Sequence, residues 1–165
     1  MFQLKPISKE GIPLALQKAE RYRLLNEPPL AESICHDILD AEPGNQAAIK
    51  IMLLAITDQF GRQRSRDVSK ARELLPLLND EYERFYYSGI ICERRGIAVL
   101  NQERHVEYSS AYEWFMEAME YFQRAEYIRP AGNDDAILRW NTCARLVMDN
   151  DLQPRYEEYG ELPLE

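Results

Sequence analysis

The sequence is poor in glycine and histidine and lacks paired cysteines, and each shortage excludes a class of protein. Seven glycines in 165 residues are too few for a fold of many short strands joined by tight turns. With only His36 and His105, a zinc site or a catalytic triad has few possible ligands or bases. Cys35, Cys92 and Cys143 form no Cys-x-x-C pair, and their odd number indicates free thiols in a reducing compartment. We therefore expect no metal site and no cofactor.

Long apolar runs and the sequence signatures of common enzymes are also absent. No stretch approaches the roughly 18 uninterrupted apolar residues of a membrane-spanning helix, so no membrane association is expected. The first ten residues, MFQLKPISKE, do not place a basic region before an apolar run, as a signal peptide would. Gly-x-Ser-x-Gly, a P-loop and a dinucleotide-binding glycine fingerprint are all missing. These absences predict a cytoplasmic protein that is not an enzyme.

The charge balance is acidic, with a formal net charge of −8. Affinity for nucleic acid comes mainly from Lys and Arg side chains that neutralise phosphates, so general nucleic-acid binding is not expected. One segment, GRQRSRDVSKAR, concentrates five basic residues between Arg62 and Arg72. Two interpretations of it stay open: a docking site for RNA or an acidic peptide, or a solvated loop that continues into a helix.

Apolar residues recur at steps of three and four along almost the whole chain, the pattern of amphipathic helices. Prolines divide the pattern: Pro28 can start a helix, Pro43 cannot continue one, and Pro76 should break or kink the fourth. Asp67 and Asn133 are the expected N-caps of the fourth and seventh helices. The expected helices cover residues 12–25, 28–42, 45–60, 67–79, 80–100, 109–128 and 133–149.

One spacing recurs in three of these helices: a small residue, two further helical positions on the same face and, twice, a closing proline. The separations of four, three and five residues occur at Ala31, Cys35, Ile38 and Pro43 and again at Ala118, Phe122, Ala125 and Pro130, and the first two also occur at Ala71, Leu75 and Leu78. A helical hairpin of this kind cannot bury its apolar face alone. Stacked copies are the expected arrangement.

The spacing resembles the second helix of the tetratricopeptide repeat family, which carries alanine, an aromatic residue, alanine and proline. Ala19 and Tyr22 match the small residue and the tyrosine of the family's first helix, and Phe85 and Gly89 stand at its aromatic and glycine positions. The resemblance covers residues 12 to about 149. It implies an all-α fold of stacked antiparallel helix pairs, forming a short right-handed solenoid with a C-terminal capping helix.

The same resemblance divides the chain into three parts. An N-terminal segment, 1–11, precedes a helical domain of about three irregular pairs and a capping helix, 12–149, and an acidic extended tail, 150–165, follows. Insertions near 61–69 and 93–110 interrupt the repeats. An irregular helical bundle is the alternative.

The function that the resemblance implies is protein binding, because family members hold a peptide or a partner helix on a concave surface lined by the first helix of each pair. We therefore expect an adaptor or scaffold for another protein, with a chaperone for a secreted bacterial protein and RNA binding through Arg62–Arg72 as alternatives. The implied groove combines apolar anchors with charges of both signs at Leu16, Glu20, Arg23, Lys50, Leu54, Asp58, Tyr86, Ile90, Glu93, Arg94, Ile137, Asn141 and Arg145.

Two further expectations concern specificity and the ends of the stack. Leu16 and Glu20 stand where some family members hold a C-terminal carboxylate with lysine and asparagine, so that clamp is absent. A terminal apolar face needs cover, which allows a homo-oligomer. The acidic tail, with Tyr156 and Tyr159, is expected to fold back and cover part of the groove.

Overall fold

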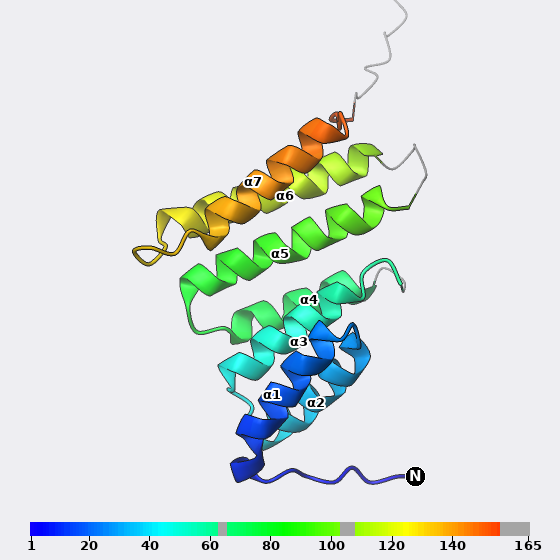
Figure 1. Cartoon of the computed structure of the whole chain (residues 1–165), viewed down its shortest axis with the longest axis vertical. Helices are drawn as coiled ribbons and strands as arrows, with labels where there is room; N and C mark the ends of the chain where they lie inside the picture. Colours follow the sequence, from blue (N-terminus) through cyan, green and yellow to red (C-terminus); the bar gives the residue numbers. More distant parts are fainter. Residues whose placement is uncertain (63–65, 103–107, 156–165) are drawn as a thin grey trace, which may run out of the picture.

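The computed structural model describes residues 1–62, 66–102 and 108–155, and its regular structure there is helical. The helices stack from α1 and α2 at one end to α6 and α7 at the other (Figure 1). The prediction of an all-α protein is confirmed. The elements are α1 (Ile12–Leu24), α2 (Pro28–Ala41), α3 (Gln46–Asp58), α4 (Arg66–Leu74), α5 (Glu81–Leu100), α6 (Tyr108–Tyr127) and α7 (Asp135–Asp149), with 3₁₀ turns η1 (Lys9–Gly11) and η2 (Leu75–Leu77).

Local sequence signals explain several of the helix ends. Pro28 stands at the start of α2, where its missing N–H costs nothing. The side chain of Asn45 accepts a hydrogen bond from the Ala48 N–H at 2.9 Å and so caps α3. The side chain of Asp80 does the same for α5 through the Tyr82 N–H at 3.0 Å. These caps satisfy backbone N–H groups that have no partner within the helix.

Two of the expected boundaries need correction and one is confirmed. Asp67 does not precede α4, because the helix already begins at Arg66. Helix α7 begins at Asp135, so its N-cap is Asp134 and not Asn133, although the Asn133 side-chain oxygen accepts the Asp135 N–H at 3.1 Å. Pro76 ends the fourth helix as expected: α4 stops at Leu74 and the chain continues as the short turn η2.

The insertion expected near 93–110 is largely helical. Helix α5 runs on to Leu100 and α6 begins at Tyr108, so most of the extra residues lengthen this helix pair. Residues 103–107 of this insertion and residues 63–65 of the other lie outside the described part. At the C-terminal end, Leu152 is buried in the same cluster as Cys143. The packed part of the chain therefore extends beyond residue 149, while the tail residues 156–165 lie outside the described part.

Each helix packs against the next, and α3 also contacts α1 and α5. Helix α5 lies in the middle of the core. Its Ile91 belongs to the buried cluster of α1 to α4, while Ile90 and Cys92 belong to the cluster shared with α6 and α7. Tyr87 packs against both clusters. The two clusters thus meet at α5, and the side chains of this helix connect the two halves of the stack.

Helices α5 and α6 approach closely because Gly89 and Gly96 of α5 lie opposite Phe122 and Phe115 of α6. A Cβ placed on Gly89 would lie 2.5 Å from the Phe122 ring, and one placed on Gly96 would lie 2.9 Å from the Phe115 ring. Both rings are fully buried. The glycines are seven residues apart and so are the phenylalanines, which keeps each pair on one helix face. This close packing fixes the position of α5.

The three cysteines are buried and have raised pKa values. Burial raises the pKa of Cys35 and of Cys92 to about 12, and the nearby carboxylates of Glu32 and Glu117 act in the same direction. Burial and the charge of Glu93 raise the pKa of Cys143 as well. Since the thiolate is the reactive form, none of the three is suited to nucleophilic catalysis.

This burial predicts that the native protein is inert to thiol reagents. With Ellman's reagent at pH 8, none of the three thiols should react during an hour in the folded state, and all three should react within minutes in guanidinium chloride. Raising the pH to 9 should leave the native protein unreactive, because a pKa near 12 keeps the thiolate fraction very small. One fast-reacting native thiol would contradict this packing.

Candidate interaction surface

The predicted groove residues come from α1, α3, α5 and α7, and ion pairs link several of them. The carboxylate of Asp58 on α3 lies between two arginines: Arg23 Nε of α1 is 2.6 Å from Oδ2, and Arg94 Nη1 of α5 is 3.1 Å from Oδ1. The three side chains are 17–31% exposed. We call this group the Arg–Asp–Arg cluster. It joins three helices that are far apart in the sequence, and all three residues are among those predicted for the groove.

Two further ion pairs join α5 to α3 and to α7. Lys50 of α3 lies 2.7 Å from Glu83 of α5. Arg139 of α7 donates to Glu93 at 2.5 Å and to the Tyr86 hydroxyl at 3.0 Å, both on α5. Burial by itself lowers the pKa of Arg139, but the charge of Glu93 and the hydrogen bond to Tyr86 outweigh it and raise the pKa. The pairs fasten α3 and α7 to α5.

Sequence reasoning missed Glu83 and Arg139. Their partners Lys50, Tyr86 and Glu93 are predicted site residues, but the contacts span more than 30 positions, so no local spacing reveals them. A weak signal existed for Arg139, which follows the buried Ala136 by three residues and therefore shares its helix face.

Two of the predicted groove residues are not on a surface. Ile90 is 1% exposed and Glu93 is 2% exposed, so neither can contact a partner, and the expectation for both is corrected. They are buried because α7 covers this part of α5 and supplies Arg139 as the partner of Glu93. The remaining predicted residues keep exposed or half-exposed side chains: Leu16, Glu20, Arg23, Lys50, Leu54, Asp58, Tyr86, Arg94, Ile137, Asn141 and Arg145.

The charges on this face are unevenly compensated. Lys50 with Glu83 and Arg139 with Glu93 are one-to-one pairs. The Arg–Asp–Arg cluster has two guanidinium groups and one carboxylate, which leaves a surplus of one positive charge. Partial burial strengthens the effect of such a charge, because the surrounding dielectric is lower than that of water. The surplus favours an additional carboxylate at this position.

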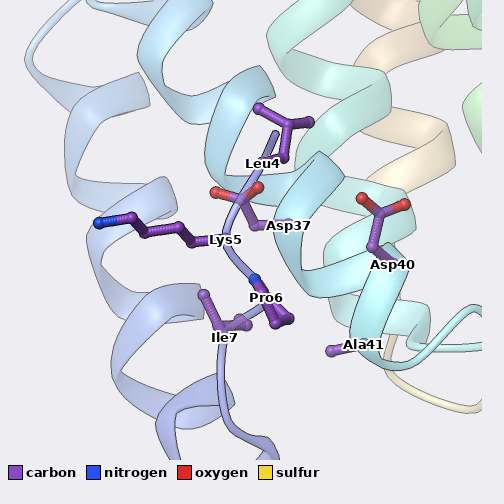
Figure 2. A pocket seen from close by; sticks show the side chains of 7 residues that line it. All are labelled: Leu4, Lys5, Pro6, Ile7, Asp37, Asp40 and Ala41. Atoms are coloured by element: carbon purple, nitrogen blue, oxygen red, sulfur yellow. The ribbon is translucent and has the colours of Figure 1, made fainter. Parts of the chain in front are cut away.

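Four hollows described on the molecule contain none of the predicted groove residues. The smallest of the four lies between the N-terminal segment and α2, with Asp37 and Asp40 on the α2 side and Pro6 on the other (Figure 2). Its volume of about 180 Å³ is below the range usual for ligand sites. Another, beside Tyr22 and Leu25, lies on α1.

The other two hollows adjoin at Phe85, and together we call them the Phe85 groove. One is lined by Leu75, Pro76, Arg84, Phe85, Ser88 and Tyr121. The other is lined by Phe85, Glu120, Gln123, Arg124, Tyr127 and Ile128. Phe85, which the repeat spacing would place in the core, is only half-buried and forms the wall between them.

The basic segment Arg62–Arg72 is partly used within the fold. Lys70 forms an ion pair with Glu32, and Arg72 lies 3.2 Å from Glu117. Burial raises the pKa of Glu32, but hydrogen bonds from Lys70 and Gln59 outweigh it, so the pKa is lowered. These pairings reduce the positive charge that the segment can offer to phosphates. The side chains of Arg64 and Arg66 lie outside the described part.

Sites of other kinds are not apparent among the described residues. No three His, Cys, Asp or Glu side chains there are grouped as a metal site would require, and none of the described helices is both long and apolar enough to cross a membrane. His36 is exposed and lies 3.8 Å from Glu32, while His105 is outside the described part. Comparisons with protein-family models, curated proteins and solved structures give no match to this chain.

Proposed function

We propose that this protein is a non-enzymatic interaction module, an adaptor or scaffold, that binds an acidic peptide or helix of another protein. The proposed binding face is formed by α1, α3, α5 and α7. The observation that carries the proposal is the Arg–Asp–Arg cluster, whose two guanidinium groups share one carboxylate. Free, buried thiols suit a reducing compartment, so the proposal includes a cytoplasmic location.

The proposal treats the stack as tetratricopeptide-like, with α7 as its cap. Its support is the contact of α3 with both α1 and α5, which makes the first helices of successive pairs neighbours. The small residues of the repeated spacing, Ala31, Ala71 and Ala118, are all fully buried. In such a stack the first helices form a continuous face, and partners lie across it.

A carboxylate of the partner is the expected ligand of the cluster. A guanidinium presents five N–H donors in a planar fork that matches a carboxylate. Arg23 directs Nε to Asp58 and Arg94 directs Nη1 to it, which leaves other N–H groups of both forks for a second acceptor. Half-exposed Leu16 and Leu54 lie on two of the same helices and supply apolar contact. The preferred ligand is therefore an acidic residue beside an apolar one.

Selection from a random peptide library displayed on phage tests the proposal, with the full chain as bait. We expect the enriched peptides to carry Asp or Glu next to a large apolar residue. Their affinity should fall about tenfold or more for Arg94→Gln, because a hydrogen bond to a charged group contributes about 1.5–3 kcal/mol. Arg23 still pairs with Asp58 in Arg94→Gln, so the variant does not leave this carboxylate unpaired.

Arg129→Gln is the matched control. Arg129 forms ion pairs with Glu126 and Asp134 in the region between α6 and α7, away from the cluster, and its loss should leave peptide affinity unchanged. The proposal fails if no peptide is enriched, or if the enriched peptides bind Arg94→Gln as tightly as they bind the wild type.

A further inference from the structure

The Phe85 groove exists because α4 ends early. In the last turn of α4, Arg72 lies 3.2 Å from Glu117 and over the Trp114 ring at 5.5 Å, so α4 and α6 are in contact there. Pro76 stops the helix after Leu74. Beyond that point the short turn η2 takes the place of the helix beside α5, and the two hollows open on either side of Phe85, with volumes of about 510 and 420 Å³.

The groove combines apolar walls with one uncompensated positive charge. Phe85, Pro76 and Tyr121 supply the apolar surface, and Tyr127 at the rim is 91% exposed. Arg84 donates to the carbonyl oxygens of Leu78 and Asn79 at 2.8 and 3.4 Å and has no carboxylate partner among the residues described.

The other charges at the groove do not compensate Arg84. Glu120 and Arg124 form a pair at 2.5 Å and cancel each other. The acidic residues of the turn before Arg84, Asp80 and Glu81, line neither hollow. The groove therefore suits a segment that alternates apolar and acidic side chains.

The chain itself contains such a segment. Residues 156–165, YEEYGELPLE, place glutamates beside tyrosines and leucines throughout. The acidic side chains match the charge of Arg84, and Leu162 and Leu164 match the apolar walls. The C-terminal tail, residues 156–165, is thus complementary to this groove in both charge and polarity.

We propose that residues 156–165 dock in the Phe85 groove of the same molecule. The chain leaves the described fold at Arg155, just beyond the C-terminal end of α7. Since α7 follows α6 through a short connection and runs back along it (Figure 1), this point lies toward the beginning of α6, whereas the groove lies at its end.

The length of the tail is sufficient for this path. The distance along α6 from Tyr108 to Arg124 is about 24 Å at 1.5 Å per residue. Residues 156–165 span up to about 33 Å when extended, so the leucines near residue 163 reach the groove. This docking site is separate from the proposed peptide-binding face, and either proposal can fail without the other.

A spin label on the tail of the full chain tests the proposal. A nitroxide at Gly160→Cys keeps every acidic and apolar side chain of the segment, and mass spectrometry checks that only one label is attached. In ¹⁵N spectra the amide signals of Ser88, Tyr121 and Tyr127 should lose at least half of their intensity, while those of Leu16 and Arg23 should not. Tyr127→Glu, an acidic change at an exposed position, should restore the signals at least twofold, and Arg84→Gln should do the same.

Leu24→Glu is the matched control, because Leu24 is 80% exposed on α1 and the change adds the same charge away from the groove. It should leave the attenuation at Tyr121 as it is in the parent chain. Attenuation on α1 and α3, or uniform attenuation, would overturn the proposal. So would attenuation that appears only when spin-labelled chains are mixed with unlabelled ¹⁵N chains, since the tail would then dock on a second copy.

Discussion

Gly89→Ala is expected to destabilise the protein, and the sign of its effect should reverse when Phe122 is shortened. In the wild type the new methyl group would lie 2.5 Å from the Phe122 ring, and overpacking of this kind costs about 1–3 kcal/mol. The helix propensity of alanine offsets about 1 kcal/mol of that cost. Phe122→Ala alone should cost about 3–5 kcal/mol, because the ring is fully buried. In the Phe122→Ala background, Gly89→Ala should be stabilising.

Chemical denaturation of the four proteins of this cycle gives the free energies of unfolding. Gly44→Ala is the control, because nothing lies within 4 Å of a Cβ at Gly44, and its effect should stay below about 1 kcal/mol. If Gly89→Ala stabilises the wild-type protein, the close approach of α5 and α6 is not as described. The equivalent cycle with Gly96 and Phe115 should give the same signs.

Among substitutions of half-exposed charged residues, Arg139→Met should lower the free energy of unfolding most. It removes the partner of Glu93, which is 2% exposed, and an uncompensated buried charge costs about 3–5 kcal/mol. The variant Glu93→Leu/Arg139→Met should be more stable than Arg139→Met alone, since no buried charge is left. Thermal and denaturant unfolding measure both differences.

The exposed pair of Arg124 and Glu120 provides the comparison. Both side chains are more than half exposed, and such pairs contribute about 0–1 kcal/mol, so Arg124→Met should change stability by less than that. An Arg139→Met effect as small as that of Arg124→Met would mean that Glu93 is solvated and α7 is not held by this contact.

The local parts of the structure were predictable from the sequence, and the reason is physical. Helix limits depend on residues within one turn, such as Pro28 and Pro76, so their signals can be read in place. Arg23, Asp58 and Arg94 belong to one predicted set, and their ion pairs bring them together, but Ile90 and Glu93 of the same set are buried.

What could not be predicted depends on contacts between distant helices. Glu93 belongs to a charged residue type that is almost never fully buried without a partner, and its partner lies 46 positions away on α7. The Phe85 groove arises because Pro76 shortens α4 beside the longer helix α6. This difference in length matters only when the two helices are neighbours, so the residues of either helix alone do not reveal it.

Binding of a selected acidic peptide to the Arg–Asp–Arg cluster is the central claim, and a double-mutant cycle tests it most directly. The Kd is measured for wild type and Arg94→Gln, each with the peptide and with a version in which its acidic residue is replaced by the amide. We predict that either change alone weakens binding about tenfold and that both together weaken it little further, because they remove the same contact. Two losses that multiply independently would place the peptide carboxylate away from Arg94 and contradict the proposed site.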